Sequence, residues 1–147
     1  MTNEYVFEIQ VAPIDGTTGT NLIKVLNLLE VRSSMALLFV VDVECNGNRA
    51  WVQRPPFQTT VDEIYMYAES VGQFDWASLF FFKSPSDEPN DTVNYAGLFT
   101  KAALVVRAVD DTFFLVYSPK AEDAERLSHF FPVQCERTRR DEITHPT

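Results

Sequence analysis

The positions of apolar and polar residues predict strands and helices that alternate along the chain. Apolar and polar side chains are interleaved in Glu4–Val11, which is typical of a strand with one polar face. A loop containing Pro, Gly and Thr follows over residues 12–19. Apolar residues then recur at helical spacing over residues 22–31, after Thr20-Asn21, either of which can cap a helix. We therefore expect a strand followed by an amphipathic helix that ends near residue 34.

The next segment has the pattern of a strand that is covered on both faces. Met35–Cys45 is apolar at nearly every position until Asp42, as expected for a central strand. The tripeptide Asn46-Gly47-Asn48 is typical of a tight hairpin turn. These signals predict a third strand over Arg49–Arg54, which Pro55-Pro56 would end.

A second helix is indicated by the residues after this proline pair. Thr60–Glu63 has the Thr-x-x-Glu pattern of a capping box, and apolar residues continue at helical spacing to Val71. Gly72 is expected to end this helix. A fourth strand is predicted over Ala77–Lys83, and the polar segment Ser84–Asp91 is predicted to be a loop.

The last third of the chain predicts a hairpin, a helix and a short strand. The hairpin strands are Lys101–Val109 and Phe113–Ser118, joined by a turn at Asp110-Asp111. A third helix is expected to start at Ser118-Pro119 and to end before Pro132. Val133–Arg139 can then form a final short strand.

This order of elements predicts the α+β class, with a mainly antiparallel sheet and about three helices. The first half, β-α-β-β-α-β, has the element order of a ferredoxin-like sandwich, and β-β-α with a last strand follows it. The chain length of 147 residues suits one domain. We assign residues 1–138 to a single α+β domain and residues 139–147 to a polar C-terminal tail.

Composition and charge narrow the range of functions. No apolar run reaches the roughly 18 residues of a membrane-spanning helix, and the acidic N-terminal residues do not resemble a secretory signal. A cytoplasmic location is therefore expected. Twelve Lys and Arg stand against 21 Asp and Glu, so the formal net charge is −9. Because nucleic-acid binding relies on clustered basic residues, direct nucleic-acid binding is not expected.

The motifs of catalysis and of cofactor binding are missing from the sequence. There are two histidines and no G-x-S-x-G motif, so a Ser- or Cys-based nucleophile has little support. The five glycines form neither a G-x-G-x-x-G motif nor a phosphate-binding loop. No cofactor is expected, and a non-enzymatic role is favoured. Without a secretory signal, Cys45 and Cys135 are not expected to form a disulfide.

What remains is a recognition surface, and acidic residues near large aromatic side chains are the candidates. A field of negative charge can steer a basic protein toward the chain, and an aromatic anchor can then slow its dissociation. The hypothesis is an inhibitor or immunity-type protein that neutralises a basic toxin or nuclease. The candidate partner-binding residues are Asp62, Glu63, Tyr65, Asp75, Trp76, Asp110 and Asp111. Trp51 and Arg54, beside the Pro55-Pro56-Phe57 loop, form a second candidate patch.

Two alternatives stay open at this point. Asp42 and Glu44 lie on the same face of a predicted strand, so they can hold a divalent metal if Asp110 or Asp111 supplies a third carboxylate. In the other alternative, the Phe80–Phe82 strand and the second helix line a small-molecule pocket, with hydroxyl groups from Tyr65 and Tyr67. A homodimer through an open sheet edge is compatible with all three hypotheses.

Overall fold

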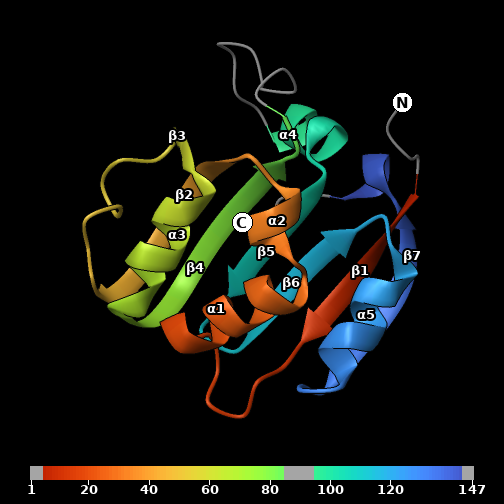
Figure 1. Ribbon diagram of the computed structural model, residues 1–147, viewed down its shortest axis with the longest axis horizontal. Helices are drawn as coiled ribbons and strands as arrows, with labels where there is room; N and C mark the ends of the chain where they lie inside the picture. The colour runs from red at the N-terminus through yellow and green to blue at the C-terminus, as the bar shows by residue number, and fades with distance from the viewer. Residues whose placement is uncertain (1–4, 85–94, 144–147) are drawn as a thin grey trace.

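The computed structural model describes residues 5–84 and 95–143, and the structural statements below concern these residues. Figure 1 shows how the elements are arranged along the chain. The strands are β1 (Tyr5–Val11), β2 (Leu37–Gly47), β3 (Phe57–Thr60), β4 (Val71–Phe82), β5 (Leu104–Val109), β6 (Phe113–Ser118) and β7 (Val133–Arg139). The helices are α1 (Gly19–Leu28), α2 (Val31–Ser34), α3 (Val61–Glu69), α4 (Tyr95–Lys101) and α5 (Ala121–Ser128), and a 3-10 turn, η2 (Arg140–Glu142), follows β7.

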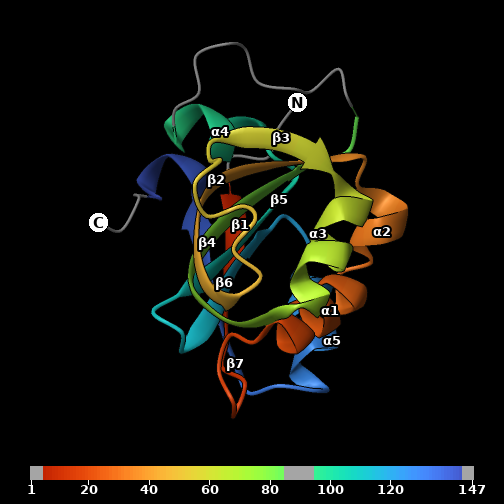
Figure 2. The same ribbon diagram turned by 90° about the vertical axis from the view of Figure 1, so that its left-hand side faces the viewer.

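The described strands form one antiparallel sheet in the order β3-β2-β4-β5-β6-β1-β7. Figure 2 shows that α1, α2, α3 and α5 lie on one face of this sheet, whereas α4 lies on the other face near one end. The predicted α+β class and the mainly antiparallel sheet are confirmed.

The larger core lies between the sheet and the helices that cover it. Leu22 and Leu26 from α1 and Ile64 from α3 are fully buried there, because each helix turns its apolar stripe toward the strands. Phe81 and Val106 of the sheet belong to the same buried cluster. Burial of these apolar side chains is the main favourable contribution to folding.

A second, smaller core explains why β4 is apolar on both faces. Phe81 points toward the helices, while Phe80 and Phe82 point the other way, as successive residues of a strand must. This second cluster is covered by α4. Its buried members are Val6, Leu37, Phe39, Phe80, Phe82, Leu98, Phe99, Ala102, Val105 and Tyr117. The two-sided burial predicted for Met35–Cys45 is thereby confirmed for the first half of β2.

The ferredoxin-like arrangement predicted for the first half is not confirmed. A split β-α-β unit brings the first strand into the sheet beside the strands that follow it. In the described sheet, β1 pairs with β6 and β7 instead, and it is separated from β2 and β4 by the β5–β6 hairpin. The order of elements was predicted correctly in outline, but the pairing that it suggested was wrong.

The predicted third strand over Arg49–Arg54 is wrong, and the predicted hairpin at Asn46-Gly47-Asn48 is wrong with it. Asn46 and Gly47 continue β2 and pair with the start of β4, with Gly47 at a φ of +90°. The residues after them form turns, in which the amide of Val52 bonds the carbonyl of Arg49. The strand that pairs with β2 comes after the proline pair, as the short β3.

Three element boundaries also differ from the prediction. The first helix breaks at Glu30, which has a φ of 56°, so that α2 is a separate turn. The second helix ends at Glu69, and β4 already begins at Val71, because these residues pair with the end of β2. The strand expected from Lys101 begins at Leu104, after α4, a helix that the pattern did not predict.

Candidate binding surface

The turn between β5 and β6 brings acidic residues from distant parts of the chain together. Asp110 and Asp111 both have a φ of 51°, and the amide of Thr112 bonds the carbonyl of Val109, which makes a tight turn with two left-handed residues. The amide of Asp111 donates to the carbonyl of Asp75 at 3.2 Å. The three exposed carboxylates of Asp75, Asp110 and Asp111 are therefore held at one end of the sheet.

The loop before α1 fastens this turn and adds another carboxylate. The carbonyl of Asp111 accepts from the amide of Thr17 at 3.2 Å and from Nε2 of Gln73 at 3.1 Å. Asp15 is exposed in the same loop, and its carboxylate accepts a hydrogen bond from Asn21 at 3.0 Å. This bond lowers the pKa of Asp15, so the side chain stays ionised at neutral pH.

Trp76 lies beside these acids on the face of the sheet opposite the main helices. It stands opposite Val109 on one side and Glu44 on the other, and its side chain is half-buried. We call this group the acidic corner. It consists of Trp76 with Asp15, Glu44, Asp75, Asp110 and Asp111.

Asp62 and Glu63 do not join the acidic corner. They lie in the first turn of α3, directly after Thr60, which pairs with Leu37 at the other end of the sheet. Asp62 forms an ion pair with Arg32 at 3.5 Å, with side chains 80% and 60% exposed. An ion pair this exposed contributes little to stability. The sequence hypothesis treated these acids as one surface, whereas the structure places them at two ends of the molecule.

Tyr65 offers little surface to a partner. It is 3% exposed, packed in the helix-side core, with the guanidinium of Arg32 at 4.0 Å from its ring centre. Burial raises the pKa of its phenol. Of the two aromatic anchors in the hypothesis, Trp76 is the one that remains accessible.

The second candidate patch is also part of the interior. Trp51 is 3% exposed and lies flat against Tyr67, with ring centres 4.1 Å apart and planes at 7°. Phe57 meets it edge-on at 5.1 Å, and Arg54 lies over the Phe57 ring. These contacts fasten the loop between β2 and β3 to α3.

The proposed metal pair lies on one face of β2, but the third ligand is not in place. Asp42 stands opposite Ser78 and Glu44 stands opposite Trp76, so the two carboxylates share the face as expected. Within residues 5–84 and 95–143, no group of three or more His, Cys, Asp or Glu side chains is close enough to hold a metal ion. Asp110 and Asp111 belong instead to the acidic corner.

The space imagined for a small molecule is filled by side chains. Phe80, Phe81 and Phe82 are fully buried in the two cores. The Tyr67 hydroxyl donates to the carbonyl of Asn48 at 2.9 Å and lies 3.0 Å from the thiol of Cys45. A groove of about 270 Å³ lies elsewhere, between β1 and β7. It is lined by Glu8, Gln10, Gln134, Cys135 and Glu136.

A buried arginine occupies the middle of the face opposite the main helices. Arg107 is 1% exposed on β5, opposite Ser78 of β4. The Tyr117 hydroxyl hydrogen-bonds with both Arg107 and Glu8, and burial together with the Glu8 charge raises the pKa of Tyr117. These hydrogen bonds and the nearby carboxylate of Glu8 favour the positive charge of Arg107 inside the sheet. The sheet face opposite the main helices therefore has a buried polar group at its middle.

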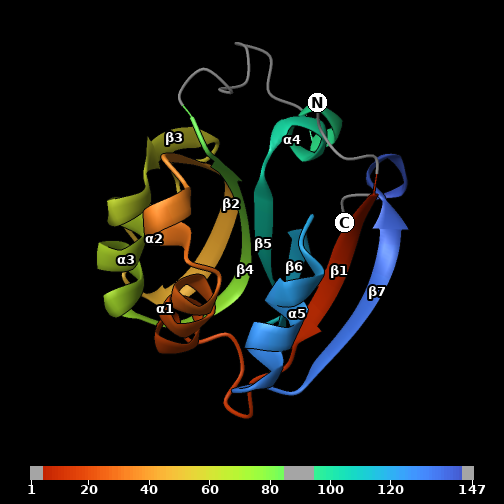
Figure 3. The ribbon, with the colours of Figure 1, turned by 45° about the vertical axis from the view of Figure 1, so that its right-hand side comes forward.

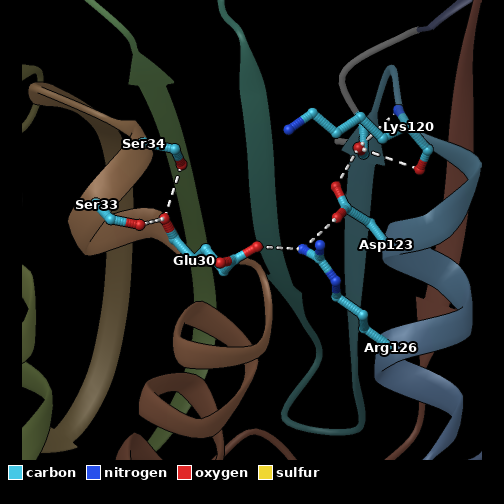
Figure 4. Close-up of polar contacts among 7 residues, drawn as sticks. Glu30, Ser33, Ser34, Lys120, Asp123 and Arg126 are labelled. Carbon is cyan, nitrogen blue, oxygen red and sulfur yellow. Dashed lines mark hydrogen bonds and ion pairs between the residues drawn. The ribbon is translucent and has the colours of Figure 1, made fainter.

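A polar cross-link on the helix side joins α5 to the corner between α1 and α2, as Figure 4 shows. Arg126 pairs with Glu30 at 2.6 Å and with Asp123 at 3.6 Å. Asp123 is buried and accepts a hydrogen bond from Ser118 at 2.5 Å. Burial raises the pKa of Asp123 above its usual value. The arrangement ties the start of α5 to the strand before it, which is a structural role.

Comparisons of the chain with protein family models, with curated proteins and with solved structures gave no match. In the part of the chain that the structure describes, no helix has both the length and the apolar character needed to cross a bilayer. The function must therefore be argued from the geometry of the molecule itself.

Proposed function

We propose that this chain is a non-enzymatic binding protein that recognises a basic protein through the acidic corner. In its most concrete form, it is an inhibitor or immunity-type protein that neutralises a basic toxin or nuclease. The observation that carries the proposal is the β5–β6 turn. Its hydrogen bonds hold Asp75, Asp110 and Asp111 around an accessible tryptophan.

The physical roles of the corner follow from charge and burial. A net charge of −9 attracts a cationic protein over long distances, and clustered carboxylates direct its approach. Trp76 then supplies a large apolar contact of the kind that dominates binding energies at interfaces. The turn is held by backbone hydrogen bonds, so little conformational entropy is lost when a partner binds.

A cytoplasmic location belongs to the same proposal. Both thiols are free, with Cys45 buried and Cys135 exposed, and this suits a reducing compartment. An immunity-type protein would meet its target before the target harmed the cell that makes it.

The experiment is capture of proteins from the source cell's lysate on the immobilised chain at low salt, followed by elution with rising salt. We compare the wild type with D110N/D111N and with a matched control, D62N/E63Q. Both variants remove two negative charges, but only the first removes them from the acidic corner. We expect one basic protein to elute from the wild type and from the control at moderate salt, and to be lost from D110N/D111N.

Two results would contradict the proposal. If the folded wild type retains no basic protein from the lysate, the proposed partner is absent and the proposal is wrong. Equal loss of the captured protein from both variants would show that total charge, and not the acidic corner, governs the interaction.

A further inference from the structure

The two edges of the sheet differ in how well they are protected against pairing with another strand. At one edge, β3 has four residues and follows Pro55-Pro56, and short strands and prolines both discourage pairing. At the other edge, β7 has seven residues and no proline within it. Figure 3 shows β7 at the outer edge, and among the described strands it pairs only with β1.

The register of β1 and β7 shows which backbone groups face outward. Val11 and Val133 are the last paired residues of the two strands, and Ala12 lies opposite Pro132 just beyond them. The amide of Ala12 donates to the carbonyl of Pro132, so Ala12 and Pro132 are a hydrogen-bonded pair. Hydrogen-bonded pairs alternate along an antiparallel ladder. The N–H and C=O groups of Val133, Cys135 and Arg137 therefore point away from β1, toward the open edge.

Only some registers allow β7 to pair with its own copy across a twofold axis. Outward residues must face outward residues, so the axis passes through a residue of β7, which is either an outward residue or one that lies between two outward residues. An axis through Arg137 would place the Arg137 side chains of the two copies opposite each other. An axis through Glu136 would pair Cys135 with Arg137 and place the two Glu136 side chains opposite each other. Like charges that lie directly opposite are destabilising.

An axis through Cys135 avoids both conflicts, and it pairs more of β7 than an axis through Gln134 does. It places Val133 opposite Arg137 of the second copy, and Gln134 opposite its Glu136. The side-chain amide of Gln134 can donate a hydrogen bond to the carboxylate of that Glu136. Because the dimer is twofold symmetric, the same contact forms a second time. The stem of Arg137 can cover Val133, as long basic side chains commonly do over apolar neighbours.

We propose that the chain forms a twofold homodimer in which β7 pairs antiparallel with β7 of a second copy, with Cys135 facing Cys135. The sheets of the two protomers then continue into one another. This dimer does not use the acidic corner, so it stands or falls independently of the proposed function.

The first test is sedimentation of the full chain under reducing conditions over a range of concentrations. Edge pairing buries a small area, so we expect a dimer with a dissociation constant on the order of micromolar. Because both protomers carry the same charge, added salt is expected to strengthen the dimer. A chain that stays monomeric at several hundred micromolar, on the order of a hundred times that constant, would overturn the proposal.

The second test reads out the register by chemical cross-linking. A short bis-maleimide is expected to join two chains through Cys135, and C135S is expected to remain dimeric but not to be joined. In the C135S background, R137C is expected to give little cross-linking, since Arg137 faces Val133 of the other copy. Efficient cross-linking at position 137, or none at position 135 in a proven dimer, would contradict the register.

The third test changes the facing charges. In a Q134E dimer, residue 134 of each protomer brings a carboxylate opposite Glu136 of the other protomer, so two pairs of like charges face each other. We therefore expect the dimer to weaken by about two- to thirty-fold. The swap Q134E/E136Q restores one amide opposite one carboxylate and is expected to recover wild-type affinity. Both changes lie on an exposed strand, and circular dichroism checks the fold of each variant. An unchanged affinity in Q134E, or no recovery in the double variant, would count against β7 pairing.

Discussion

Replacement of Trp51 by alanine is expected to be among the most destabilising single changes on the surface loops. Trp51 lies in the turns between β2 and β3, yet its side chain is 3% exposed. It stacks on Tyr67 with ring centres 4.1 Å apart and meets Phe57 edge-on at 5.1 Å. The indole thus joins a loop without regular structure to α3 and to β3.

The magnitude follows from the size of the buried indole and from the two aromatic rings that it touches. Truncation of a buried Phe or Trp to alanine costs about 3–5 kcal/mol of unfolding free energy. The two aromatic pairs account for about 0.5–1.5 kcal/mol each beyond burial. Since small domains have a stability of about 5–15 kcal/mol, W51A should still fold at room temperature and can be measured. W51F, which keeps a flat ring against Tyr67, should lose less than half as much.

The assay is urea denaturation followed by circular dichroism, with F130A as the control. Phe130 is 63% exposed, so its removal should change the unfolding free energy by less than about 1 kcal/mol. A loss below about 1 kcal/mol in W51A would refute the anchoring role of Trp51. A loss in W51F as large as that in W51A would refute the importance of stacking.

Three further predictions concern the turn, a close packing contact and a buried carboxylate. D110N/D111G should keep the β5–β6 turn, because Asn and Gly adopt positive φ readily. Its unfolding free energy should match that of the wild type or exceed it, while partner capture is lost. A large destabilisation would contradict the turn assignment. G19A should cost about 1–3 kcal/mol in urea denaturation, because a Cβ there would overlap the carbonyl oxygen of Ala68, and a neutral effect would show that α1 and α3 are less closely packed. Burial raises the pKa of Asp123 above 3.8, so the folded state holds its proton more tightly and stability falls as pH rises from about 3.8 to the raised value. D123N should lack this decline when unfolding is measured across that pH range, and an identical pH profile in both proteins would contradict it.

Local patterns predicted most elements of the fold, and they failed where distant residues decided the outcome. Helical spacing located α1, α3 and α5, and the Asp110-Asp111 turn was found between its two strands. Asn46-Gly47 resembled a hairpin turn, but these residues continue β2 and pair with the start of β4. The position of β1 between β6 and β7 leaves no trace in local periodicity, since it depends on which strands meet in space.

The candidate surface was predicted only in part, for the same reason. Asp75, Trp76, Asp110 and Asp111 were chosen from the sequence, and the structure brings them together through β4 and β5. Asp15 was missed, because its loop reaches the turn by a contact that no local motif encodes. Tyr65 was chosen as an anchor, yet its helical position turns it into the core.

The proposed function requires the acidic corner to steer a basic protein, and association kinetics are the sharpest test of that steering. The measurement is the association rate of the captured basic protein with the wild type, D110N/D111N and D62N/E63Q at several salt concentrations. Steering predicts that the logarithm of the rate falls steeply with salt for the wild type and D62N/E63Q, and less steeply, from a lower starting value, for D110N/D111N. Equal rates and equal salt dependence for all three proteins would contradict it.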